Sequence, residues 1–497
     1  MHISRLFLGV SLLTAALAVG GVRPANAQAL PFLAPGDAGL RHEVQLDADN
    51  GEIPLTTTWP LPTFDVPADQ RDALRNHNQP GSGTDAGWFM TAARDPTKIR
   101  TFTDTARNNS AGVQAGWAAS DYAGGAIRLS YNTNSADGMK IQLDGTYAAW
   151  RFGNWWVTAG QQDRWWGPGW DSSLILSSNA RPMPGIGLER ASSQVESWKG
   201  FRWLGPWHLV TFLNHMENHR ADFNNTLFGG MRFTFAPAHG VEIGLSRTAE
   251  FCGQGHRCGP STLFDVLIAK SNRRVNPIVD NDPSQAALLA QKQSAQFIAT
   301  DVRWHIGDSP IALYWQQLGM VFDDKNLRPR QTLQLAGLEF ASRSILDGRF
   351  RGFIELTDTA CGDVSFSKTD HADYGCAYEK DTWRAGYRYR GRPIGDSMDR
   401  DGVRVTLGGL YTDTQARNWE LRLRHLQLNR GNIAQVGLVP DPVSLVAARL
   451  WNAEFDVAGD YKGFRYAIGV GGDHGGPVTE RAQFTARAFV NLSHAWE

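Results

Sequence analysis

A two-residue alternation of apolar and polar side chains runs through most of this 497-residue chain and limits the folds open to it. Its clearest instance places Trp451 and Phe455 on one side of an expected strand, with Asn452 and Glu454 on the other. Successive side chains of a strand point to opposite faces, so the pattern predicts strands with one apolar and one polar face. The same period recurs from about residue 111 to the C-terminus, interrupted by turn-rich stretches.

Both a soluble β-sandwich and a membrane β-barrel would alternate in this way. Three features favour the barrel: the pattern persists without a second helical domain, aromatic residues often end the strands, and the last strand ends on Trp496. Pairing that strand with the first would leave no open edge. With strands of about ten residues and comparable loops, the region holds roughly 16 to 20 antiparallel strands. We therefore expect an all-β transmembrane barrel.

The first 27 residues have the features of a secretory signal peptide. Arg5 precedes the apolar run 6–22, and Ala25-Asn26-Ala27 is a small-x-small cleavage site. The alternative, an N-terminal membrane anchor, is disfavoured by the Arg23-Pro24 break and by the cleavage site. We expect a mature chain that begins near Gln28, outside the cytoplasm.

Residues 28–110 carry the helical signals of the chain. Asp37 can cap a helix that stops at Asn50-Gly51, and Asp65 opens a second helix that ends before residue 79. Residues 56–61 between them are expected to be extended. The expected organisation is a signal peptide over 1–27, an N-terminal plug region over 28–110, and a barrel over 111–497.

Charge and cysteine content restrict the partners and the ligands. A formal net charge of −1, with 20% charged residues, argues against electrostatic binding to nucleic acid. The four cysteines form two local pairs, and the simplest of three connectivities is Cys252–Cys258 with Cys361–Cys376. A metal site at the first pair, which encloses His256, is the alternative, but the chain has no CxxC pair. We expect no metal and no cofactor.

The segments that resemble enzyme motifs do not have the flanking sequence that those motifs require. The segment HMENH at 215–219 spaces two histidines four apart, but Met216 stands where a metalloprotease helix needs glutamate, and its flanks are strand-like. The glycine-rich GVGGDHGG at 469–476 is expected to be a hairpin turn. No nucleophile elbow or Walker loop occurs, and no carboxylate pair can be picked out as that of a glycosidase.

The segment RWWGPGWDSS, residues 164–173, surrounds a Gly-Pro-Gly turn with three tryptophans and charged neighbours. Flat C–H faces of sugar rings pack on aromatic rings, while sugar hydroxyls and carboxylates take hydrogen bonds from Arg, Asp and Asn. This chemistry suggests a polysaccharide-binding surface made of Asp163, Arg164, Trp165, Trp166, Trp170, Asp171, Asn179 and Arg181.

Other interpretations of these residues stay open. The tryptophans could mark the membrane interface, or brace a loop that folds into the barrel. Arg164 and Arg181 could form internal ion pairs with Asp163 or Asp171. Further along the chain, Arg388, Arg390 and Arg392 alternate with Tyr387 and Tyr389, which predicts a strand with arginines toward the lumen and tyrosines toward lipid. Such arginines would favour an anionic polymer or brace the wall.

The stretch DRWWGPGWDSSLILSSNARPMPGIGLER at 163–190 resembles the signature region of the capsule assembly Wzi family. TTWPL at 57–61, EIGLSRTAEFCGQG at 242–255 and YRYRGRPIGDSMDRDG at 387–402 are also similar to that family. The resemblance runs from about Leu40 to the C-terminus. It implies an 18-stranded outer-membrane β-barrel with a small N-terminal helical plug on the periplasmic side. The chain departs from the pattern in its Gly-Ser loop at 81–87, its cysteine-closed loops and a Glu497 after the last aromatic residue.

The resemblance also implies a function in the bacterial outer membrane. We expect a lectin-like protein that binds capsular or extracellular polysaccharide and attaches or assembles it at the cell surface, as a monomer in contact with outer-membrane lipid and without a catalytic step. The first alternative is a porin-like channel or polysaccharide export pore, and the second is an outer-membrane enzyme that modifies glycans or lipids.

Overall fold

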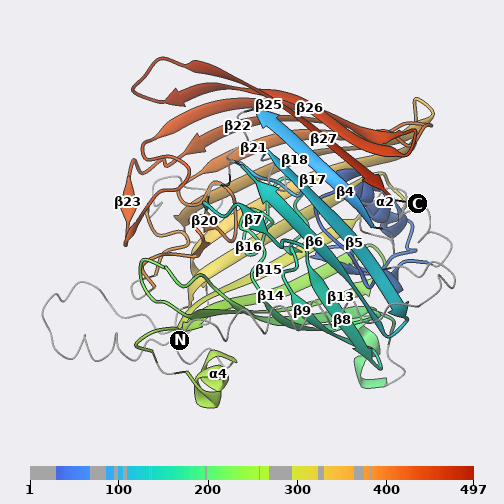
Figure 1. Cartoon of the computed structure of the whole chain (residues 1–497), viewed down its shortest axis with the longest axis horizontal. Helices are drawn as coiled ribbons and strands as arrows, with labels where there is room; N and C mark the ends of the chain where they lie inside the picture. Colours follow the sequence, from blue (N-terminus) through green and yellow to red (C-terminus); the bar gives the residue numbers. More distant parts are fainter. Residues whose placement is uncertain are drawn as a thin grey trace, which may run out of the picture.

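A computed structural model shows a closed antiparallel β-barrel whose lumen is filled by chain segments (Figure 1). The structure describes residues 30–67, 86–94, 99–103, 109–133, 135, 137–195, 199–256, 258–267, 294–322, 329–362, 374–380 and 383–496. The expected signal peptide over 1–27 lies outside these residues, as does most of the second N-terminal helix expected from Asp65.

The barrel wall has 18 strands, one of which is split in two. In chain order the wall is made of β4 (Ala86–Arg94), β5 (Ser110–Ser120), β6 (Ala123–Asn132), β7 (Ile141–Gln142), β8 (Tyr147–Phe152), β9 (Trp155–Gly160), β11 (Gly185–Arg190), β12 (Trp207–His215), β13 (Thr226–Ala238), β14 (Val241–Cys252), β15 (Ser294–His305), β16 (Ile311–Phe322), β17 (Pro329–Ile345), β18 (Gly348–Gly362), β21 (Val403–Thr412), β22 (Asn418–Leu428), β25 (Ala448–Tyr461), β26 (Phe464–Pro477) and β27 (Gln483–Ala495). Strands β7 and β8 both pair with β6, so together they occupy one place in the wall.

The last strand closes the barrel against β4, as the sequence predicts for a wall without edges. Residues of β27 and β4 pair antiparallel from Ala488↔Arg94 to Ala495↔Gly87. The expected start of the barrel at residue 111 is therefore wrong, because β4 pairs with both β27 and β5 and belongs to the wall. The helical signals before residue 80 do not extend to β4, so they do not mark where the barrel begins.

Alternation separates the two faces of the wall along β25. Trp451 and Phe455 are 63% and 43% exposed and point outward, whereas Asn452 and Glu454 on the opposite face are buried in the lumen. The alternation is interrupted where the chain leaves the sheet between β7 and β8, so that Ile141 is 64% exposed whereas Ala149, at an odd-numbered position like Ile141, is fully buried.

The two ends of the barrel differ in the length of their connections. Tight turns at 121–122, 153–154, 239–240, 346–347 and 462–463 lie at one end. The long connections that follow β9, β14, β18 and β22 start from the other end. Outer-membrane barrels have short periplasmic turns and longer extracellular loops. We call the long-loop end the outer mouth. The glycine-rich 469–476, expected to be a turn, lies within β26 instead, and the connection follows at 478–482.

The expected N-terminal helix is present as α2 (Ala38–Asp49), at the short-turn end of the barrel (Figure 1). Asp37 caps it by accepting a hydrogen bond from Leu40 N at 2.9 Å, and it ends at Asn50 as predicted. Asp49 binds Arg303 at 2.8 Å and Arg351 at 2.7 Å on the wall, which fixes the helix inside this end. Among the described residues, no helix is long and apolar enough to cross a membrane.

Short elements fill the rest of the structure. They are β1 (Phe32–Leu33), β2 (Thr58–Trp59), β3 (Leu61–Pro62), η1 (Thr63–Asp65), β10 (Trp165–Trp166), η2 (Lys199–Leu204), α4 (Pro260–Leu267), β19 (Arg388–Tyr389), β20 (Arg392–Pro393), β23 (Gln435–Val436) and β24 (Val439–Pro440). The expected extended segment at 56–61 is confirmed by β2 and β3.

Candidate functional site

The connection 161–184 between β9 and β11 folds into the lumen. Its strand β10 pairs with β2 of the N-terminal region, joining Trp165 to Trp59 and Trp166 to Thr58. Gln316 on β16 donates a hydrogen bond to the Trp166 carbonyl at 2.9 Å, and Arg41 of α2 donates to the Gly169 carbonyl at 2.8 Å. The segment thus ties α2, β2 and the wall together.

The Gly-Pro-Gly turn lets this segment pass close to other backbone and side-chain atoms. Any Cβ at Gly169 would lie 2.2 Å from the Ser172 carbonyl oxygen, and one at Gly167 would lie 2.5 Å from Gln316 Nε2. Gly167 also has φ of +142°, a conformation that side chains other than hydrogen disfavour. Close packing in the lumen therefore requires glycine at both of these positions.

The three tryptophans of the segment are buried inside the barrel. Trp165 and Trp166 are 0% exposed and Trp170 is 1% exposed. The guanidinium of Arg41 lies 4.2 Å from the ring centroid of Trp170, and Phe353 stacks on the same ring at 5.9 Å. The three rings expected to form an aromatic platform for sugars are therefore enclosed in this structure, and none of them lies at a membrane interface. Bracing of a loop inside the barrel, the remaining interpretation, fits their burial.

Asp171, another expected sugar contact, is the centre of a buried charge cluster. Its carboxylate lies 2.8 Å from Arg424 and 3.2 Å from Arg404, and Arg422 is 3.7 Å away. Burial alone would raise the pKa of Asp171, but the guanidinium groups of Arg424 and Arg404 hold that pKa well below its usual range. The side chain is fully buried, so it pins the segment to β21 and β22 and does not face a ligand.

Two of the arginines expected to contact polysaccharide are also buried inside the protein. Arg164 is buried with its guanidinium 4.8 Å from the Phe212 ring centroid, and burial lowers its pKa. Arg388 binds Asp399 at 2.7 Å and Glu379 at 2.5 Å. Neither guanidinium is placed to meet a polymer.

The expected lipid-facing strand around Arg388 is not part of the wall. The chain forms a small hairpin, β19 paired with β20, inside the long connection before β21. Tyr387 is 0% exposed, and its hydroxyl donates a hydrogen bond to the Ile175 carbonyl at 2.8 Å and lies 2.7 Å from the Thr248 hydroxyl. Tyr389 is 5% exposed. The prediction that tyrosines here face lipid is wrong, because Arg-Tyr alternation also suits a buried hairpin whose rings pack on the luminal core.

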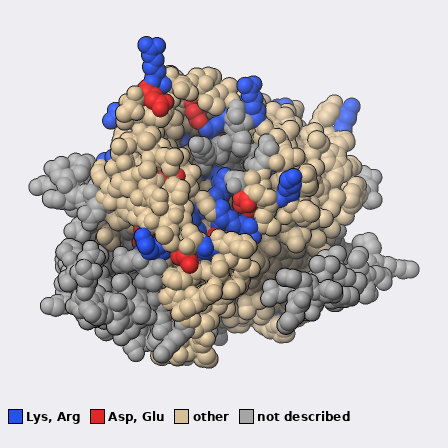
Figure 2. Space-filling model, turned by 60° about the vertical axis from the view of Figure 1, so that its left-hand side comes forward, with Lys and Arg blue, Asp and Glu red and all other residues tan. Residues whose placement is uncertain are grey.

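The remaining arginines of the sequence prediction gather at the outer mouth. Arg181 binds Asp144 at 2.7 Å and Asp137 at 2.5 Å, and Arg390 lies 4.0 Å from Asp137. Arg392 donates to the Asn179 side chain at 3.4 Å. Figure 2 shows this end of the molecule, where basic side chains gather in a hollow with acidic ones at its edges.

The electrostatics of this cluster favour the charged form of Arg181. Burial would lower the pKa of Arg181, but its hydrogen bonds to Asp144 and Asp137 raise that pKa above its ordinary value. The Arg390 side chain remains 28% exposed. We call Asn179, Arg181, Arg390 and Arg392, with Asp137, the mouth cluster; it combines charged donors, a carboxylate and an amide.

Asp163 lies below the mouth cluster in a polar chamber. Ser178, Arg181 and Arg100 from luminal segments and Arg128 from β6 line the same space. Burial and the neighbouring Asp144 raise the pKa of Asp163 to about 7, against the opposing effect of Arg128. The carboxyl group therefore changes charge near neutral pH.

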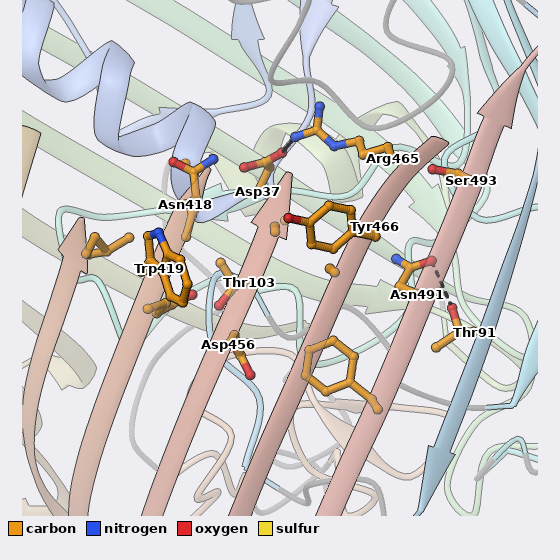
Figure 3. Close-up of a pocket in the computed structure, with 18 residues that line it drawn as sticks. Asp37, Thr91, Thr103, Asn418, Trp419, Asp456, Arg465, Tyr466, Asn491 and Ser493 are labelled. Atoms are coloured by element: carbon orange, nitrogen blue, oxygen red, sulfur yellow. Dashed lines mark hydrogen bonds and ion pairs between the residues drawn. The ribbon is translucent and has the colours of Figure 1, made fainter. Parts of the chain in front are cut away.

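A second polar chamber lies at the short-turn end, beside the start of α2 (Figure 3). Asp37 and Arg465 form an ion pair at 2.9 Å on its edge, and Asn491 accepts a hydrogen bond from Thr91 on its wall at 3.4 Å. Thr91 and Asn491 also line the chamber below the mouth. The β27–β4 wall thus carries polar side chains toward both ends.

Both expected disulfides are present. Cys252 is bonded to Cys258 and Cys361 to Cys376, with Cα–Cα distances of 4.9 and 6.2 Å. His256, between the first pair, stacks on Trp383 at 5.1 Å. No group of three His, Cys, Asp or Glu side chains among the described residues could hold a metal ion.

Comparison with known proteins decides the family. The family model of the capsule assembly protein Wzi matches residues 92–494. The chain belongs to the Wzi capsule assembly family.

Two relatives agree with this assignment. A 55.8 kDa protein in the cps region of Klebsiella pneumoniae is 25% identical over 418 residues, which are 80% of this chain and 77% of that protein. The solved structure of Wzi of Escherichia coli, described as an outer membrane protein involved in group 1 capsule assembly and as a carbohydrate-binding β-barrel, superposes with a TM-score of 0.76. The match covers 94% of this chain and 100% of that one at 22% identity, so it shows the common fold.

Sequence reasoning missed the acidic half of the mouth cluster. Asp137 and Asp144 come from the β6–β8 region, and Glu217, which accepts a hydrogen bond from Arg390 N at 3.0 Å, comes from the connection after β12. No spacing links these residues, since the barrel brings together loops that are far apart in sequence. Their only signal was their position in turn-rich stretches between alternating strands.

Proposed function

We propose that this protein binds acidic polysaccharide at the outer mouth and holds it at the surface of the bacterial outer membrane. The observation that carries the proposal is the mouth cluster, in which Arg181, Arg390 and Arg392 stand beside Asn179 at the long-loop end. Arginine binds carboxylates through two parallel hydrogen bonds. Asn179 is buried and donates to the Pro393 carbonyl at 2.8 Å, so in this proposal it positions Arg392 and does not contact the polymer. Membership of the capsule assembly family and the fold shared with a carbohydrate-binding barrel support it.

Retention of a polymer requires many weak contacts and no deep pocket. A chain of repeating sugars presents the same carboxylates and hydroxyls to the mouth many times, so avidity supplies the strength of attachment. We propose that binding proceeds without a catalytic step. The protein acts as a monomer in this proposal, with lipid around its outward face and no nucleic-acid partner.

The export-pore alternative fits the lumen less well. Segment 161–184, α2 and the β19–β20 hairpin pack against one another inside the wall. A polymer passing through would have to displace the buried Asp171 cluster, whose charges are compensated only in the packed state.

Surface attachment can be tested in an encapsulated host that lacks this protein. Cell-bound and shed polysaccharide are compared after complementation with the wild type, with the double variant Arg390→Glu and Arg392→Glu, and with Arg202→Glu as control. Arg202 is exposed in η2 at the opposite end of the barrel. We expect the double variant to shift polymer from cells to medium at constant total, and the control to retain it. A collapse of total polymer without the protein would assign it to export instead, and no change in either quantity would exclude a part in the capsule.

A further inference from the structure

The outward face of the barrel carries a basic groove just above its aromatic belt, on a surface separate from the mouth cluster. Arg449 at the start of β25 and Arg430 in the connection after β22 line the groove with Tyr374, Gln427 and Glu480. By the alternation of β25, Arg449 points to the same side as the exposed Trp451, and therefore away from the lumen.

The height of this groove follows from the length of β25. Trp451 and Tyr461, each 63% exposed, are ten residues apart on its outward face. At about 3.3 Å per residue and a strand tilt of about 40°, they are separated by about 25 Å along the barrel axis, which is the height of the apolar band of an outer-membrane barrel. The two rings thus mark the two membrane interfaces, and Arg449 lies two residues beyond Trp451, at the level of the outer headgroups.

The surroundings of the groove are amphiphilic. Val478, 55% exposed, lines it, and His425 packs on Trp451 at 4.4 Å below it. Arg430 is 3.9 Å from Asp358, a long contact between two partly exposed side chains, and its guanidinium lies 5.7 Å from the Tyr374 ring centroid. Among the described residues, Arg449 has no ion-pair partner.

We propose that this groove binds the phosphorylated headgroup of an outer-leaflet glycolipid. Arg449 and Arg430 would hold a phosphate by charge-assisted hydrogen bonds, and the acyl chains would follow the wall past Trp451. Glu480 on the rim opposes the phosphate and limits the affinity. The site would fix the rotation and depth of the barrel in the membrane.

The test measures lipid binding in the absence of polysaccharide, so its result is independent of the function proposed for the mouth. Detergent-solubilised full-length protein is titrated with lipid A carrying two phosphates, with lipid A stripped of phosphate, and with inorganic phosphate, and bound species are counted by native mass spectrometry. We expect the wild type to bind the phosphorylated lipid at least tenfold more tightly than the stripped lipid. Inorganic phosphate alone should bind weakly, since it lacks the acyl contacts.

Matched variants decide whether the groove is responsible. Arg449→Glu with Arg430→Glu should weaken binding of phosphorylated lipid at least tenfold, Glu480→Gln should strengthen it, and Arg202→Glu should leave it unchanged. The single variant Arg449→Gln should give an intermediate loss if the double variant does not fold. Equal binding of stripped lipid, tight binding of inorganic phosphate alone, or groove variants that bind like the wild type would each overturn the proposal.

Discussion

The carboxylate of Asp171 lies 2.8 Å from the guanidinium of Arg424, and both side chains are fully buried inside the barrel. Asp171 belongs to the inward-folded connection 161–184, and Arg424 belongs to the wall strand β22. The same arginine reaches Glu454 on β25 at 2.7 Å. This relationship fixes the central segment to the wall with charges that cannot be solvated if one partner is lost.

Replacement of Asp171 by asparagine should therefore destabilise the folded barrel. Asparagine keeps the shape but leaves Arg404 and Arg424 without their shared counter-charge, and breaking a buried pair on one side costs about 3–5 kcal/mol. We expect a marked fall in the apparent melting temperature of the purified protein in detergent. The control Asp308→Asn alters an exposed aspartate in the turn 306–310 and should melt like the wild type. A melting temperature unchanged in Asp171→Asn would show that the cluster contributes nothing to stability.

Alanine substitutions at Trp170 and Arg390 should have different effects: the first should lower stability, and the second should lower polysaccharide binding. Trp170→Ala leaves a cavity beside Arg41 and Phe353, and truncation of a buried aromatic residue costs about 3–5 kcal/mol. Arg390→Ala removes a partly exposed guanidinium and should leave the melting temperature nearly unchanged.

The two variants are compared by melting and by retention of purified acidic polysaccharide on immobilised protein. We expect Arg390→Ala to retain less polymer at an unchanged melting temperature, and Trp170→Ala to lose polymer only in proportion to its unfolded fraction. A stable Trp170→Ala barrel with lost binding would restore the tryptophan to the sugar-binding surface.

The sequence predicts the wall better than the interior. Alternation needs only local information, so the outward face around Trp451 and the closure by β27 are both confirmed. The lumen of a barrel is polar, so a segment that folds into it can carry charges beside tryptophans without being exposed. For that reason Trp165 and Asp171 look like a ligand surface in sequence and are buried in the structure.

The mouth cluster could be predicted only in part. The sequence predicts Asn179 and Arg181 because they lie near the tryptophan motif, and Arg390 because it alternates with tyrosine. Their partner Asp137 lies more than 40 residues from Arg181 in the chain, and only the circular order of the strands brings them within 2.5 Å. A single sequence carries no signal for such pairs between loops.

Conductance distinguishes a filled barrel from an open one. An empty 16- to 18-stranded barrel encloses an aqueous channel, but here Arg41 of α2 binds the carbonyls of Pro168 and Gly169 across the lumen at 2.8 Å. We expect the full-length protein in planar bilayers to conduct far less than a porin of similar strand number. A stable, porin-like conductance would favour the channel alternative and show that the luminal segments leave a continuous path.

Asp163 should make stability depend on pH near neutrality. Burial and Asp144 raise its pKa from 3.8 to about 7 in the folded protein. The folded state therefore binds the proton more tightly than the unfolded chain does, and the stability gained is fully present below about pH 4. That stability is lost as the pH rises through about 7, where the carboxyl group ionises inside the chamber.

Asp163→Asn should remove this loss, because the amide stays neutral at every pH while filling the same space. The melting temperature of the wild type should fall relative to that of the variant between pH 5 and 8, and the two curves should run parallel above pH 8. Glu379, whose pKa burial raises to about 7, also titrates in this window, but it is present in both proteins and cancels in the difference. A difference that stays constant from pH 5 to 8 would mean that Asp163 keeps an ordinary pKa, and that Arg128 and Arg100 offset its burial completely.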